Sequence, residues 1–167
     1  KNISYVGDNV FDRTPWLAKR GNSEYDMLND FVLLKYNGSS NSPEIPKGTI
    51  CIVDSAFEDK PITAISIPSS VKYIGESVFN NCKKLKEIIL PEGLERIGTG
   101  AFARSGLLKI TIPDTVTDMG QFLFVECENL SEINMGKNIK DIDYDGFRGT
   151  PWLEDRNKDE FIIINDT

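Results

Sequence analysis

Residues 67–91, IPSSVKYIGESVFNNCKKLKEIILP, contain one complete copy of the unit that decides the fold of this chain. Copies of this unit begin at a proline or glycine after a short apolar run, at Pro46, Pro68, Pro91, Pro113 and Gly136. The steps between these starts are therefore 22, 23, 22 and 23 residues. A phenylalanine stands eleven residues after every start, at Phe57, Phe79, Phe102, Phe124 and Phe147. Such a fixed register indicates a repeat protein.

Each unit closes on a run of alternating apolar residues, such as Leu107, Ile110 and Ile112. Alternation with β-branched residues predicts a strand. Because so short a unit cannot bury its own apolar side, neighbouring units must share one core, with their strands in a parallel sheet about 4.8 Å apart. The sequence predicts a mostly β, α+β solenoid, with parallel strands on its concave face and short helical turns and loops on the other.

A longer period of 136 residues is superimposed on the short one. The motif T-P-W-L occurs at residues 14–17 and again at residues 150–153. In both places, Thr at the N-cap and Pro at the first helical position predict a short helix. After the first motif, two apolar runs flank Asn29 and Asp30, which predicts an inserted β-hairpin over residues 25–36.

We therefore expect one domain over residues 1–167 that is a segment of a longer array. Its parts are a partial repeat at 1–13, an inserted helix and hairpin at 14–41, repeats starting at 46, 68, 91, 113 and 136, and a second insertion from 150 onward. Both ends cut through a unit, which leaves stacking edges open to edge-to-edge self-association. The chain starts at Lys1 without a charged and apolar leader, so any signal peptide is expected to have been removed or to lie outside this sequence.

The pattern I-P-x-x-V-x-x-I-G-x-x-x-F-x-x-C-x-x-L-x-x-I-x-L-P, complete in residues 67–91, closely resembles the BspA-like leucine-rich repeats, and the match covers nearly the whole chain. The resemblance implies a leucine-rich-repeat solenoid in a cell-surface or secreted protein, of the kind that anaerobic gut and oral bacteria use for adhesion. It brings no catalytic motif and no cofactor. The departures are modest: Ser105 stands where Cys is typical, Thr49 and Val53 replace an aliphatic and a small residue, and Asp143 replaces Gly.

Composition excludes several classes of partner. The chain has 19 Lys and Arg against 26 Asp and Glu, a net charge of −7. It contains no run of basic residues to bind phosphates, so nucleic acid and anionic membranes are poor candidates. The longest apolar stretches, such as residues 31–34 and 161–164, are far shorter than the roughly 20 residues of a membrane span. A protein or cell-surface ligand is the expected partner.

The three cysteines do not predict a disulfide or a metal site. Cys82 and Cys127 share one repeat position two units apart, about 10 Å on the stacking distance of a parallel sheet, which exceeds the span of a disulfide. Cys51 has a different place in its unit, and we interpret the other two as small core residues. The chain has no His, which removes the usual zinc ligand set. Asp143 and its neighbours Asp141 and Asp145 lack the glycine and terminal glutamate of an EF-hand, so we interpret them as a solvated turn.

Residues that alternate with the inward positions of the strands are expected to form ladders that face solvent. These ladders are the candidate ligand-binding residues. The first contains Ala64, Glu87, Lys109 and Glu132, and the second contains Ser66, Ile89, Thr111 and Asn134. Opposite charges in neighbouring units are expected to attract weakly along the first ladder, by about 0.2–1 kcal/mol per pair.

Aromatic residues outside the repeat give a second set of candidates. We expect Trp16 and Trp152 to anchor their helices to the solenoid, and the five phased phenylalanines to form its core. The hairpin aromatics Tyr25, Phe31 and Tyr36 are candidates for contact with a partner, since a projecting hairpin can present them.

The leading hypothesis is a non-enzymatic module for protein binding or adhesion, whose ligand meets the strand face, the hairpin or both. The alternative is a structural spacer in a surface stalk. A third hypothesis is a glycoside hydrolase using Glu87 and Glu132, whose expected separation of about 10 Å is near the upper end for inverting enzymes. The last is disfavoured because Lys109 stands between the two carboxylates, and because the missing His removes the commonest general base.

Overall fold

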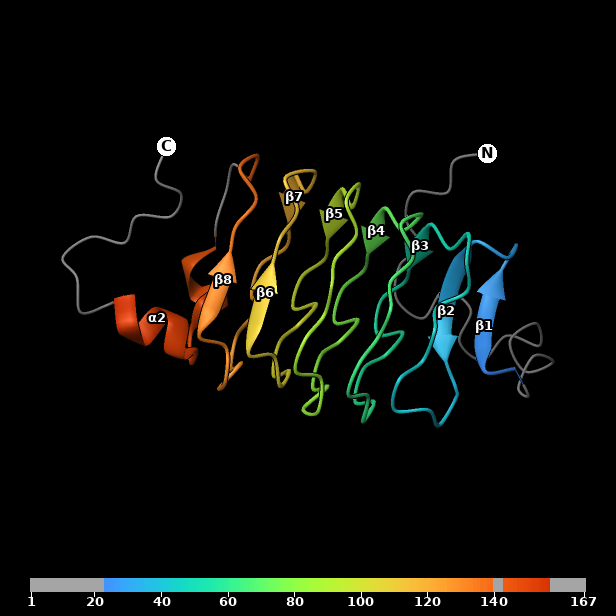
Figure 1. The fold of residues 1–167 in the computed structure, drawn as a ribbon, viewed down its shortest axis with the longest axis horizontal. Helices are drawn as coiled ribbons and strands as arrows, with labels where there is room; N and C mark the ends of the chain where they lie inside the picture. The colour runs from blue at the N-terminus through green and yellow to red at the C-terminus, as the bar shows by residue number, and fades with distance from the viewer. Residues whose placement is uncertain (1–22, 140–142, 157–167) are drawn as a thin grey trace.

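The computed structural model describes residues 23–139 and 143–156. Figure 1 shows successive units side by side along the long axis of the molecule, with the strands running across it. In chain order the elements are β1 (Tyr25–Leu28), β2 (Val32–Tyr36), β3 (Cys51–Ile52), β4 (Tyr73–Ile74), β5 (Arg96–Ile97), β6 (Lys109–Thr111), β7 (Asp118–Met119), β8 (Glu132–Asn134), the 3-10 helix η1 (Tyr144–Phe147) and the helix α2 (Pro151–Arg156). The described residues therefore form mainly short strands and turns, with few helices.

The strands form two sheets. The first has six strands in the order β1-β2-β3-β4-β5-β7, and the second pairs β6 with β8. From β2 onward the pairs are parallel, and Tyr73, for example, lies opposite Cys51 on one side and Arg96 on the other. The register advances by one repeat per strand, so each unit stacks on the next.

The strand expected at the end of each unit is present as β6 and β8, and isolated parallel bridges continue its row of pairs through Ser66. Another side of the units, where helical turns and loops were expected, carries the six-stranded sheet instead. Its strands β3, β4, β5 and β7 have two residues each. A two-residue strand is too short to show an alternating pattern, which is why the sequence did not distinguish it from a turn.

Aromatic rings form a continuous stack through the shared core. Successive ring centroids lie 5.1, 5.5, 5.6, 5.8 and 5.7 Å apart, in the order Tyr36, Phe57, Phe79, Phe102, Phe124 and Phe147. None of these side chains is more than 2% exposed. Each stacked aromatic pair contributes about 0.5–1.5 kcal/mol beyond the burial of its surface. The prediction that the phased phenylalanines form the core is confirmed.

A column of glycines lets neighbouring units approach closely. Gly75, Gly98 and Gly120 directly follow the inward residue of β4, β5 and β7. A Cβ atom on Gly98 would lie 2.5 Å from the carbonyl carbon of Gly75 and 2.6 Å from the backbone nitrogen of Glu76. The Gly98 N–H donates to the carbonyl oxygen of Ile74 at 2.8 Å. A side chain at this position would therefore hold the units apart.

β1 and β2 pair antiparallel across a tight turn. Asn29 and Asp30 stand at its centre with φ of 52° and 63°, the left-handed pair that a type I′ hairpin turn requires. β2 is also the parallel neighbour of β3, so the hairpin extends the six-stranded sheet rather than projecting from it. The first T-P-W-L helix, expected at residues 14–17, lies outside the described residues.

Candidate ligand-binding surface

All eight residues of the predicted ladders have exposed side chains. The neighbours in adjacent units are Lys109 with Glu132, Thr111 with Asn134, and Ser66 with Ile89. Ala64 and Glu87 precede Ser66 and Ile89 by two residues in their own units. The residues therefore lie on one face, which we call the ladder face. Their role in binding stays a prediction.

Glu44 extends the second ladder by one unit and was missed from the sequence. It forms a parallel bridge with Ser66, and its side chain is exposed. Glu44 precedes Ile45 as Ser66 precedes Ile67, so the repeat register alone could have placed it.

Six of the eight ladder residues line a hollow of about 360 Å³, namely Glu87, Ile89, Lys109, Thr111, Glu132 and Asn134. Ile89 lies in it with 83% of its surface exposed, the largest fraction among the large apolar side chains that the structure describes. Its neighbours Ile88 and Leu90 are 7% and 6% exposed, so strand alternation turns Ile89 outward while they pack inward. Core packing therefore does not account for an isoleucine at this position.

The charges of the ladder face are partly paired. Lys109 Nζ lies 3.2 Å from Glu87 Oε1, as the alternating charges predicted. Glu132 is the register neighbour of Lys109, but its Oε1 accepts a hydrogen bond from the Asn134 amide at 3.5 Å. Within residues 23–139 and 143–156 no ion pair involves Glu132, so the second expected attraction is not formed. Glu132 therefore presents a carboxylate beside the hollow.

The three hairpin aromatics differ in their surroundings. Tyr36 is 1% exposed and begins the aromatic stack, so its ring is part of the core. Tyr25 is half-buried against it, with ring centroids 5.2 Å apart. Phe31 is also half-buried and packs on a small cluster that includes Val32 and Cys51. Tyr36 therefore offers no surface to a partner, and the sequence missed its role because its unit departs from the phenylalanine register.

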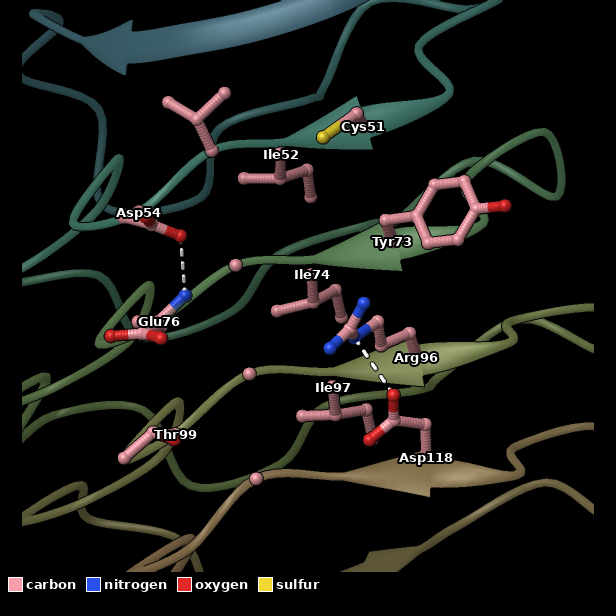
Figure 2. Close-up of a pocket in the computed structure, with 14 residues that line it drawn as sticks. Cys51, Ile52, Asp54, Tyr73, Ile74, Glu76, Arg96, Ile97, Thr99 and Asp118 are labelled. Carbon is pink, nitrogen blue, oxygen red and sulfur yellow. Dashed lines mark hydrogen bonds and ion pairs between the residues drawn. The ribbon is translucent and has the colours of Figure 1, made fainter. Parts of the chain in front are cut away.

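A second hollow, of about 220 Å³, lies on the six-stranded sheet and was not anticipated from the sequence. Figure 2 shows Tyr73, Arg96 and Asp118 on one side of it, and Asp54 and Glu76 on the other. Arg96 Nε lies 3.0 Å from Asp118 Oδ2, and Asp54 Oδ1 accepts the backbone N–H of Glu76 at 2.6 Å. The glycine column runs between the two sides, so the hollow lies where these positions carry no side chain.

The cysteines belong to the core and not to a reactive site. Cys82 and Cys127 are 0% exposed, as predicted, and their thiols donate to the carbonyl oxygens of Phe57 and Phe102 at 3.1 and 3.0 Å. Burial raises the pKa of Cys51 to about 11 and that of Cys82 to about 12. These thiols stay protonated near neutral pH and are therefore poor nucleophiles.

We expect a thiol reagent at pH 8 to modify the folded chain slowly, and to count three thiols once the chain is denatured without reductant. The unfolded thiol titrates near pH 9.0, whereas the folded thiols of Cys51 and Cys82 titrate near 11 and 12. The folded chain then binds more protons, so its stability should fall as pH rises from about 9 through 12. A count below three thiols, or stability that rises over this range, would contradict the assignment.

The described residues offer neither a metal-ion site nor a membrane-spanning helix. No group of three Cys, Asp or Glu side chains within residues 23–139 and 143–156 is arranged to hold a metal ion. Of the acidic turn interpreted as solvated, Asp143 and Asp145 are described, and Asp141 is not. No described helix is both long and apolar enough to cross a membrane.

Comparison with solved structures gives several bacterial leucine-rich-repeat proteins. TpLRR of T. pallidum matches with a TM-score of 0.69 at 28% identity, over 74% of this chain and 63% of that protein. A leucine-rich repeat protein from Bacteroides ovatus matches with a TM-score of 0.59 at 31% identity, over 68% of this chain and 33% of that one. A leucine rich cell surface protein from Faecalibacterium prausnitzii shares the fold, with a TM-score of 0.59 at 23% identity over 77% of this chain and 45% of that one. This chain thus spans less than two thirds of each.

A search of curated proteins gives no match. Residues 50–165, in contrast, match the model of the BspA type leucine rich repeat region in six copies. That range contains the phased phenylalanines, the glycine column and both ladders from Ala64 to Asn134. The chain belongs to the BspA type leucine-rich-repeat family.

Proposed function

We propose that this chain is a non-enzymatic protein-binding module of a surface or secreted bacterial protein, and that its ligand meets the ladder face. The observation that carries the proposal is the 83% exposed Ile89 in the hollow of about 360 Å³. An apolar side chain surrounded by polar groups is the arrangement of an interface with an apolar centre and a polar rim. Lys109, Thr111 and Asn134 would form part of that rim.

The charge of the ladder face supports a protein ligand with basic groups. Glu132 forms no ion pair among the described residues, and Glu44 and Glu92 stand on the same face without an ion pair in that part of the chain. The whole chain carries a net charge of −7. Opposite charge on a partner would speed association and orient it, with the apolar contact at Ile89 supplying most of the affinity.

A location at the cell surface is part of the proposal. The family resemblance supports it, and one protein that shares the fold is a leucine rich cell surface protein from Faecalibacterium prausnitzii. The alternative function, a structural spacer, predicts an evenly polar surface. The exposed apolar side chain of Ile89 does not fit an evenly polar surface, so it favours binding over the spacer function on the ladder face.

We expect Ile89→Ser to weaken binding at least tenfold, because it removes the apolar centre of the interface, a loss of about 1.4 kcal/mol or more. Binding would be measured by biolayer interferometry against immobilised fibronectin, laminin and fibrinogen, as representative surface-exposed host proteins. Replacing Glu87 and Lys109 together by serine should weaken binding less, because this pair is exposed to solvent.

The chain offers a matched control on its other sheet. Arg96 and Asp118 form an ion pair of the same exposed kind, at 3.0 Å, and both can be replaced by serine. This control should bind as the unsubstituted chain does. Equal binding by the Ile89 variant, or loss of binding in the Arg96 and Asp118 control alone, would refute the ladder face. Absence of binding to all three probes would count against adhesion to host proteins and favour the spacer.

A further inference from the structure

The aromatic stack of the core ends at Trp152. The ring of Trp152 lies 4.8 Å from that of Phe147 and is tilted by 36° to it, where the earlier phenylalanine pairs lie 5.5–5.8 Å apart. Trp152 is 3% exposed, and Leu153 beside it is 7% exposed. The larger indole thus covers the face of Phe147 that the next unit would cover inside the stack.

The repeat register shows that the chain leaves the stack at this point. Thr150 follows Phe147 by three residues, the place that Cys82 and Cys127 hold after their own phenylalanines. Trp152 and Leu153 follow Phe147 by five and six residues, the two spacings at which the leucine of a ladder strand follows its phenylalanine in the earlier units. The backbone N–H of Trp152 donates to the carbonyl oxygen of Leu130 at 3.0 Å. This bond joins the start of α2 to the preceding unit. After it, the chain continues as helix and not as a strand.

The turn into helix is determined locally by the T-P-W-L motif. Thr150 is 0% exposed, and its hydroxyl oxygen accepts the N–H of Leu153 at 3.2 Å, which caps the first turn. Pro151 opens α2, where its fixed φ suits a helix and its missing N–H is of no consequence. Figure 1 shows α2 beside β8, at the end of the row of units.

The other end of the stack is also formed by residues outside the repeat pattern. Tyr36, not phenylalanine, stacks on Phe57, and Tyr25 packs on Tyr36 at 5.2 Å. Both belong to the antiparallel pair of β1 and β2, and β1 ends the order of the six-stranded sheet. Within residues 23–139 and 143–156, the stack therefore has a distinct element at each end.

We propose that the T-P-W-L motif is a stop signal that closes one block of stacked units, and that the antiparallel strands after it open the next block. The core described here is then one closed block between Tyr25 and Leu153, and its ladder face ends at β8. The same motif stands at residues 14–17, 136 residues earlier in the sequence, and by this proposal it would close the preceding block. An array of such chains consists of rigid blocks of fixed length and is not one continuous solenoid.

Hydrogen exchange followed by mass spectrometry on the whole chain tests this proposal with two tryptophan variants. Trp152→Ala removes the closing ring, so amides of residues 123–139 should exchange at least tenfold faster, with residues 45–79 unchanged. Trp16→Ala alters the motif assigned to the preceding block, so protection over residues 45–139 should stay as it is. Unchanged exchange in the Trp152 variant would overturn the proposal, as would an equal loss of protection in the Trp16 variant.

A third variant keeps the test decisive if Trp152→Ala unfolds the chain. Trp152→Phe retains an aromatic ring at the end of the stack, so it should restore most of the protection of residues 123–139. Failure of this variant to restore protection would show that Trp152 acts in some other way than by covering Phe147.

Discussion

Replacing Phe102 by alanine is expected to lower the free energy of unfolding by about 3–5 kcal/mol, the range for deleting a buried aromatic ring. Phe102 is 0% exposed and stacks on Phe79 at 5.6 Å and on Phe124 at 5.8 Å. Its removal leaves a cavity between two units that other side chains cannot fill without separating the rings. Urea unfolding followed by far-ultraviolet circular dichroism would measure the loss.

Phe122→Ala provides the control for this experiment. Phe122 lies in the same region but is 44% exposed, so its replacement should change stability by no more than about 0.5 kcal/mol. Its φ of 56° is unfavourable for phenylalanine and alanine alike, so the replacement leaves the backbone strain as it is. A loss below about 1 kcal/mol for Phe102→Ala, or equal losses for the two variants, would show that the stack does not hold the units together.

Gly98→Ala is expected to destabilise the chain by about 3 kcal/mol, the upper part of the usual range for overpacking. The added Cβ would meet the backbone of the preceding unit at Gly75 and Glu76, at 2.5 and 2.6 Å. Backbone atoms cannot move aside as a flexible side chain does, so the spacing between units has to increase. Thermal and urea unfolding of the variant would measure the effect.

Whether Gly98→Ala lowers or raises the free energy of unfolding shows whether Gly98 lies against the neighbouring unit or has free space around it. At a glycine with free space and ordinary φ, replacement by alanine stabilises a protein by about 0.4–1 kcal/mol. A gain in stability for Gly98→Ala would therefore disprove close approach of the units. Thr99→Ala, at the next and partly exposed position, should have little effect and controls for changes at the surface.

The repeat register was enough to predict the parts of the fold that recur in every unit. The phenylalanine column, the buried cysteines and the strand register that sets Lys109 opposite Glu132 all follow from spacing, because stacked units bring equivalent positions together. The same logic would have placed Glu44. The outward direction of Ile89 also follows, since it alternates with buried neighbours.

Features that do not recur, or that are very short, could not be predicted. The two-residue strands β3, β4, β5 and β7 carry too little pattern to be recognised, although together they form most of the larger sheet. Tyr36 was assigned to a contact surface because it stands outside the phenylalanine register, yet packing places it in the core. The preference of Glu132 for Asn134 over Lys109 depends on side-chain geometry that sequence spacing does not determine.

The hydrogen bonds between units have a mechanical consequence. They join each strand to its equivalent in the next unit, so they lie along the row of units. Tension on the two ends of the chain would load these bonds unit by unit, and the outermost unit would yield first. Each unit that opens would release about 75–80 Å of extended chain, against a thickness of about 4.8 Å in the stack. A protein built in this way would therefore lengthen in steps under tension.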